Sequence, residues 1–161
     1  MLPVIREIEE GFMNTVMLRQ PFSLRLMRSG SLLLLLGLLT GLVVPKFANP
    51  RMGLASHVEG VMGGLMLVIL GCLFPQLRLG APAMKAAYGL SVYGAFANWI
   101  NPLVAAVWDA GGSMMPGASR GKKGTRVQEM IIAVMAVTMV MALLPAVVLV
   151  LWGLRKSGSG L

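Results

Sequence analysis

The residue with the clearest chemical potential in this sequence is its one histidine, His57. Gly60, Gly64 and Gly71 follow it at spacings that place all of them on the helix face of His57. That face carries almost no side chains, so it suits two different partners. A flat macrocycle such as haem, with its iron held by His57, could lie against it. Alternatively, Gly60 and Gly64 form a GxxxG pair that lets a second helix approach closely.

A single histidine per chain limits what a bound haem could do. An electron carrier needs two axial ligands, whereas one ligand leaves the sixth site open and the iron free to act as a Lewis acid. The chain has 14 methionines, but Met62 and Met66 share a helix with His57 and cannot reach the opposite face of a ring. Two alternatives to an enzyme stay open. One is a haem-based electron carrier or gas sensor, and the other is a haem-free accessory or transport subunit.

A second group of functional candidates contains Asn98, Trp99 and Asn101, which precede Pro102. Pro102 has no N–H to donate to the carbonyl of Asn98, four residues earlier. A free carbonyl, two amides and an indole therefore gather at one kink. Irregular backbone at membrane depth is tolerated where it lines a cavity. The alternative is that the two asparagines bond neighbouring helices, at about 1 kcal/mol or less each.

Two sequence patterns resemble capping boxes, which start helices. Ser56 with Glu59 predicts one helix start, and Thr125 with Gln128 predicts another. This pattern explains Glu59 without a role as a general base. Glu129 has no such explanation.

The composition indicates the class of protein that carries these residues. Apolar residues make up 57% of the 161 residues and charged residues only 12%, against about a quarter charged in soluble domains. The net charge is +8, but the Lys and Arg residues lie between apolar blocks rather than along an aromatic-rich stripe. We therefore expect a lipid bilayer, and not nucleic acid, as the partner. The single Cys72 excludes an intrachain disulfide.

The apolar blocks predict an all-α, polytopic membrane protein with four transmembrane helices. The four expected spans cover residues 29–48, 56–77, 84–108 and 125–153. The domain organisation has three parts: an amphipathic surface segment at 1–28, a four-helix transmembrane domain at 29–156, and an appended linker at 157–161. Basic residues slightly favour a cytoplasmic location for both termini.

Three stretches together resemble a known family. They are NPRMGLASHVEGVM at 49–62, GLLTG at 37–41 and YGAFANW at 93–99. They are similar to small bacterial membrane isomerases, a family that includes styrene oxide isomerase and hydroxylaminobenzene mutase. The resemblance implies a homotrimer in the bacterial inner membrane, with haem b in each chain and His57 as its axial ligand.

The resemblance also implies roles for the other candidate residues. Asn98 and Asn101 are expected to bind a substrate oxygen or nitrogen as catalytic groups, and Trp99 to line the pocket against an aromatic ring. Gly60 and Gly64 are expected to lie beside the haem that His57 holds.

Three positions depart from styrene oxide isomerase. That enzyme has Asn, Tyr and an acidic residue where this chain has Gly63, Pro102 and Gly94. The sequence around His57 is closer to that of hydroxylaminobenzene mutase. The resemblance thus implies a haem b-dependent mutase that turns an arylhydroxylamine into a 2-aminophenol. The alternative is an epoxide isomerase that yields an aldehyde.

Overall fold

The fold is known from a computed structural model, which describes the backbone of residues 2–158 and the side chains of residues 20–155. Within that part of the chain every regular element is helical, as predicted. The long helices are α1 (Leu2–Val43), α2 (Pro50–Leu73), α3 (Ala81–Trp108) and α5 (Arg126–Gly158). The short ones are η1 (Val44–Lys46), η2 (Phe74–Gln76) and α4 (Pro116–Ser119).

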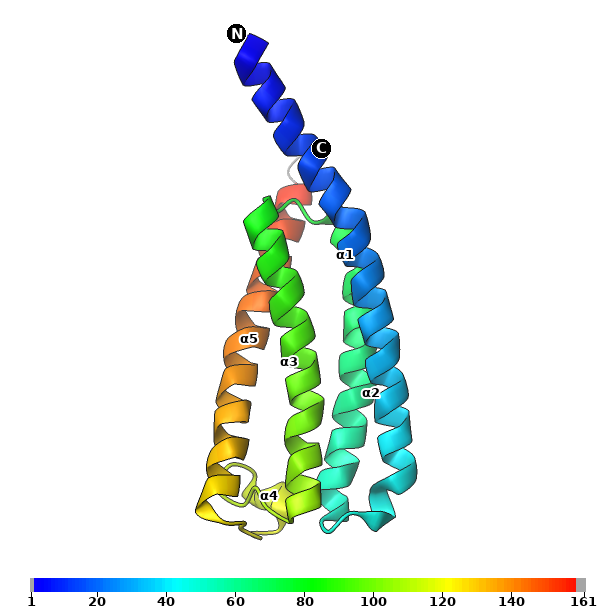
Figure 1. Ribbon diagram of the computed structural model, residues 1–161, viewed down its shortest axis with the longest axis vertical. Helices are drawn as coiled ribbons and strands as arrows, with labels where there is room; N and C mark the ends of the chain where they lie inside the picture. The colour runs from blue at the N-terminus through cyan, green and yellow to red at the C-terminus, as the bar shows by residue number, and fades with distance from the viewer. Residues whose placement is uncertain (1, 159–161) are drawn as a thin grey trace.

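The long helices confirm the four predicted membrane spans. Among the described residues, the helices long and apolar enough to cross a bilayer are Gln20–Lys46, Pro50–Gln76, Ala81–Trp108 and Arg126–Arg155. The start of α1 and the end of α5 lie at the end of the bundle that holds the α2–α3 connection, and η1 and α4 lie at the opposite end (Figure 1). The chain is thus a multi-pass membrane protein.

The first helix differs from the prediction at its beginning. Helix α1 continues without a break from Leu2 to Val43, and the part apolar enough to cross a bilayer begins at Gln20 rather than at residue 29. The surface segment at 1–28 stays a prediction. The side chains of residues 1–19, on which the predicted amphipathic character depends, lie outside the described residues, as does most of the predicted linker at 157–161.

The second helix begins earlier than the sequence indicated. Its N-cap is Asn49, whose side chain accepts a hydrogen bond from the backbone N–H of Met52, and Pro50 occupies the first helical position. The predicted capping box at Ser56 and Glu59 is therefore wrong. The helix is already formed there, and both side chains are free to reach neighbouring helices.

The fourth span starts as predicted. The backbone N–H of Gln128 donates to the Thr125 hydroxyl at 3.3 Å, and the N–H of Thr125 donates to the Gln128 side chain at 2.8 Å. This reciprocal pair is the capping box that the sequence indicated.

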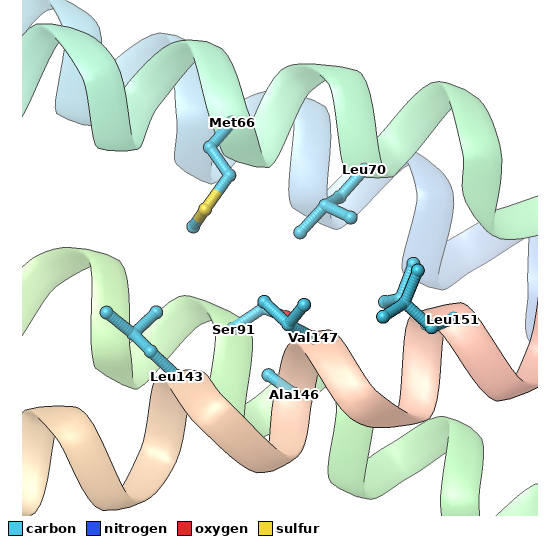
Figure 2. Close-up of a pocket in the computed structure, with 8 residues that line it drawn as sticks. Met66, Leu70, Ser91, Leu143, Ala146, Val147 and Leu151 are labelled. Atoms are coloured by element: carbon cyan, nitrogen blue, oxygen red, sulfur yellow. The ribbon is translucent and has the colours of Figure 1, made fainter.

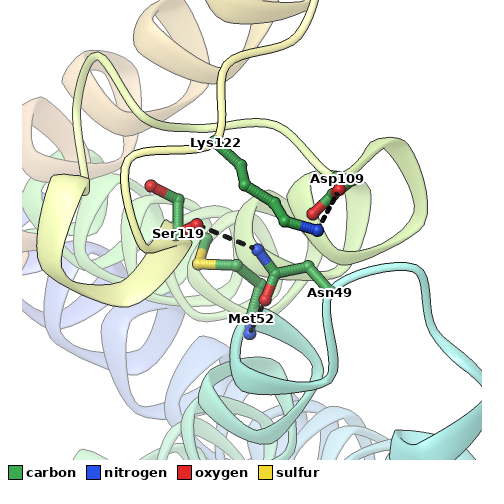
Figure 3. A network of polar contacts seen from close by, with 5 residues as sticks. All are labelled: Asn49, Met52, Asp109, Ser119 and Lys122. Atoms are coloured by element: carbon green, nitrogen blue, oxygen red, sulfur yellow. Dashed lines mark hydrogen bonds and ion pairs between the residues drawn. The ribbon is translucent and has the colours of Figure 1, made fainter.

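The connection from α3 to α5 is held by charged and polar side chains. The Glu129 carboxylate accepts from the N–H groups of Gly111, Ser113 and Gly124 at 2.8–3.0 Å. Lys122 pairs with Asp109 at 2.6 Å, and the Asn49 amide donates to the carbonyl of Ser119 at 3.4 Å (Figure 3). These contacts fix the loop over the first turn of α2, and they give Glu129 the role that the sequence left unexplained.

Candidate active site on the second transmembrane helix

The glycine-bearing face of α2 is covered by α1. A Cβ added at Gly64 would lie 2.5 Å from the backbone nitrogen of Leu34, and one at Gly60 would lie 2.7 Å from the Cα of Gly37. The backbones of the two helices are therefore in direct contact, which is what small residues permit inside a membrane. Within the chain, this packing leaves no room for a macrocycle over Gly60 and Gly64. Of the two alternatives for these glycines, the geometry supports helix packing. Contrary to the prediction, Gly60 and Gly64 do not face a haem within this chain.

His57 is held at the edge of this seam. Its Nδ1 atom lies 2.8 Å from the carbonyl oxygen of Gly37, and Gly41 leaves space for the ring, because a Cβ there would lie 2.6 Å from Nδ1. A carbonyl oxygen can only accept, so Nδ1 carries the proton and donates. Nε2 then presents its lone pair, and it has no hydrogen-bond partner among the described residues.

This arrangement fits an axial haem ligand. Metal-binding histidines commonly donate their second ring N–H to a backbone carbonyl, which fixes the tautomer and the ring orientation. No group of three or more His, Cys, Asp or Glu side chains that could hold a metal ion occurs in the described part of the chain. An iron bound here would thus need a macrocycle to supply its other ligands. His57 has the donor chemistry for that, although the ring plane cannot lie where the glycines are.

Trp99 lies where three helices meet. Its indole N–H donates to the hydroxyl of Thr40 on α1 at 3.2 Å, and its carbonyl accepts from Ser56 on α2 at 2.9 Å. A Cβ at Gly60 would lie 2.7 Å from its ring. The side chain is half-buried, so part of the ring remains available. Its predicted role as a wall for an aromatic substrate stays a prediction.

The Glu59 carboxylate, which the sequence predicted to cap a helix, instead bonds to a neighbouring helix. Asn98 on α3 donates its side-chain N–H to Oε2 of Glu59 on α2. Glu59 is the tenth residue of α2, about 14 Å along its axis. Ionisable groups at that depth are costly and usually functional. The pattern that concealed Glu59 was its spacing from Ser56, which suggested a cap that does not form.

Glu59 also borders a space large enough for a small molecule. An open pocket of about 470 Å³ lies between α2 and α4. Its lining residues are Arg51, Leu54, Ala55, Val58 and Glu59 of α2 and Gly117 and Ala118 of α4. The carboxylate is half-buried at its wall. A proton acceptor held by an amide next to such a pocket can take a proton from a bound molecule.

Asn101 lies one turn beyond Asn98 and is only 3% exposed. Its side-chain oxygen is buried without a hydrogen-bond partner among the described residues. Buried acceptors usually find a partner, so this oxygen remains available to a donor. The expected cluster is thus only partly formed, because Asn98 binds Glu59 while Asn101 does not join it.

The predicted ligand and the polar pair lie on different faces of α2. His57 and Glu59 are two residues apart, which rotates their side chains by about 200°. His57 bonds to α1, whereas Glu59 bonds to α3. One copy of the chain therefore places them on opposite sides of the helix.

Together, the fold and these side chains define a multi-pass helical membrane protein with a ligand-type histidine and a carboxylate at membrane depth. The styrene oxide isomerase family matches residues 22–155. Hydroxylaminobenzene mutase HabB of Ectopseudomonas oleovorans is 50% identical over 137 residues, which cover 85% of this chain and 84% of that protein. Hydroxylaminobenzene mutase HabA of the same organism is 38% identical over 131 residues, 81% of this chain and 97% of that protein. No solved structure matches the chain.

The chain belongs to the styrene oxide isomerase family, and it is an isomerase. This confirms the resemblance that the motifs around His57 indicated.

Proposed function

We propose that the chain is a haem b-dependent mutase of the bacterial inner membrane that converts an arylhydroxylamine, such as hydroxylaminobenzene, into a 2-aminophenol. The main support is its 50% identity to hydroxylaminobenzene mutase HabB over most of both chains. Substrate and product have the same atoms, so the enzyme needs neither an oxidant nor a reductant. An N–O bond breaks, a C–O bond forms at the ring carbon ortho to the nitrogen, and a proton moves from that ortho carbon to nitrogen.

The chain's own residues account for the binding and proton steps. His57 would hold ferric haem, and the Lewis acidity of that iron would be the chemistry that the cofactor supplies. Glu59, held by Asn98, accepts the proton that leaves the ring carbon. The free oxygen of Asn101 can receive a hydrogen bond from the substrate nitrogen or hydroxyl, and Trp99 offers an aromatic surface for the ring.

The opposite placement of His57 and Glu59 supports an oligomer. A site that uses both residues takes them from two neighbouring copies of the chain. A closed ring of identical subunits satisfies every copy if each places the edge of its α1–α2 seam, where His57 lies, beside the Glu59 side of the next. We propose the homotrimer that the resemblance implies.

An epoxide isomerase is the second candidate, because the family match carries that name. Three positions count against it. A Cβ at Gly94 would lie 2.6 Å from the Leu143 side chain, and one at Gly63 would lie 3.3 Å from Leu33, while Pro102 is buried. These positions pack against the chain itself and offer no polar group to orient an epoxide.

Product analysis distinguishes the two reactions. Purified protein, or membranes that contain it, would be given hydroxylaminobenzene and styrene oxide in parallel. We expect 2-aminophenol from the first, little aldehyde from the second, and neither product from His57→Ala. Aldehyde as the main product would favour the epoxide reaction. No product from either compound with haem-loaded protein would refute the proposed function.

A further inference from the structure

A small apolar cavity lies between α2, α3 and α5, near the middle of the bundle (Figure 2). Its volume is about 120 Å³. Met66 and Leu70 of α2 form one wall, Ser91 of α3 lies opposite, and α5 closes the remainder with residues that include Val147 and Leu151. Val147 and Leu151 are 51% and 61% exposed, so they form the rim that faces lipid.

The one polar group in the lining is the hydroxyl of Ser91. Ser91 is 1% exposed, and its oxygen has no hydrogen-bond partner among the described residues. A buried hydroxyl without a partner is unfavourable, because water would satisfy it in the unfolded chain. A ligand that brings one donor or acceptor into this cavity would remove that penalty.

The size of the cavity limits the ligand. A dry, apolar protein cavity of about 150 Å³ is known to bind benzene. The space here is somewhat smaller and extends to a lipid-facing rim, so it suits a single aromatic ring and excludes a lipid chain as a full occupant. The chemistry points to a small aromatic compound with one hydroxyl, amine or hydroxylamine substituent directed at Ser91.

The cavity is aligned with the Glu59–Asn98 pair. Met66 follows Glu59 by seven residues, and Ser91 precedes Asn98 by seven, so each pair shares a helix face about 10 Å apart along the axis. Ser91 is also ten residues from the start of the 28-residue α3, about 15 Å along its axis, and so lies inside this membrane span. A compound dissolved in the membrane reaches this cavity directly, two helical turns from the polar pair.

We infer that the α2–α3–α5 cavity is a second binding site, which takes small aromatic compounds with one polar substituent from the bilayer and holds them on the way to Glu59 and Asn98. The identity of the natural ligand rests on the proposed function. Binding itself does not, so it can be tested without turnover.

The test uses two fluorinated probes of nearly equal size, 4-fluorophenol and fluorobenzene. Fluorine NMR would follow the binding of each to the purified protein with its cofactor in lipid nanodiscs, with empty nanodiscs subtracted. Val147→Phe fills the cavity from its rim. Val148→Phe is the matched control, because Val148 is the adjacent residue, is 62% exposed and does not line the cavity.

We expect Val148→Phe to bind each probe as tightly as the wild type does, and Val147→Phe to bind each at least about tenfold more weakly. Ser91→Ala should weaken 4-fluorophenol by about three- to tenfold, the range for one lost hydrogen bond, and leave fluorobenzene unchanged. Equal binding by the Val147 and Val148 variants would overturn the site. An unchanged preference for the phenol in Ser91→Ala would overturn the role of the hydroxyl.

These outcomes separate this inference from the proposed function. Probe binding that depends on Val147 and Ser91, in a protein that does not isomerise hydroxylaminobenzene, would support the site and refute the reaction. Turnover of hydroxylaminobenzene by a protein whose probe binding does not depend on Val147 or Ser91 would support the reaction and refute the site.

Discussion

The two sides of α2 pack in different ways. Toward α1, glycines bring backbone against backbone, so that a Cβ added at Gly30 would lie 2.6 Å from the carbonyl oxygen of Gly64. Toward α5, the helices are separated by a cavity, and α5 packs along α3 instead (Figure 1). Lipid provides no hydrophobic force between helices, so contact depends on shape. The glycine side forms a rigid seam with His57 at its edge, and the side with larger residues leaves space for small molecules.

The largest effect is expected on the open side, at Glu59. Glu59→Gln keeps an oxygen that can accept from Asn98 but removes the proton acceptor. We predict that turnover of hydroxylaminobenzene falls by at least about 100-fold, while the thermal midpoint of unfolding changes little. Steady-state kinetics and a melting curve on the same preparation test this. If the variant unfolds at a lower temperature and its activity falls only as much as the fraction of folded protein, Glu59 has a structural role.

The next effect is on the closed side, at Gly64. Gly64→Ala places a methyl group against the backbone of Leu34, which cannot move aside as a side chain could. We predict a loss of about 2–3 kcal/mol in the free energy of unfolding, the upper range for overpacking. Gly89→Ala is the matched control, because a Cβ there meets nothing within 4 Å, and it should be neutral or stabilising by up to about 1 kcal/mol. Unfolding in a denaturing detergent measures both, and equal losses would contradict the difference between the two sides.

The smallest effect concerns the polar contact between α3 and α5. The Tyr93 hydroxyl donates to Thr138 at 2.8 Å on an exposed surface. Tyr93→Phe removes only this bond, and we predict a cost of about 0.6 kcal/mol in the same unfolding assay, the mean for interhelical hydrogen bonds in membranes. A loss as large as that of Gly64→Ala would mean that polar bonds, not close packing, hold this bundle together.

The sequence was sufficient for features that depend on local composition. Long apolar blocks predicted the four spans, and the Thr125–Gln128 capping box was correct. The Ser56 prediction was wrong because Asn49 and Pro50, seven and six residues earlier, start the helix first. A serine and a glutamate at the right spacing look the same in sequence whether they cap a helix or bond to its neighbours.

The glycine face shows a second limit of sequence reasoning. The absence of side chains at Gly60 and Gly64 suits a helix and a flat cofactor equally well. The signal that could have decided between them was on α1, where three glycines recur on one face. Gly30 meets Gly64, Gly37 meets Gly60, and Gly41 meets His57. The cavity at Ser91 could not be predicted at all, because it depends on how far α5 stands from α2.

Absorption spectroscopy is the sharpest test of the proposal that Nε2 of His57 holds a haem iron. Protein purified from haem-replete cells should show a Soret band. His57→Ala should lose that band or most of it, while Gly89→Ala, remote from His57 in packing, should keep it. Folded wild-type protein without the band, or a His57→Ala variant with an unchanged one, would contradict the claim.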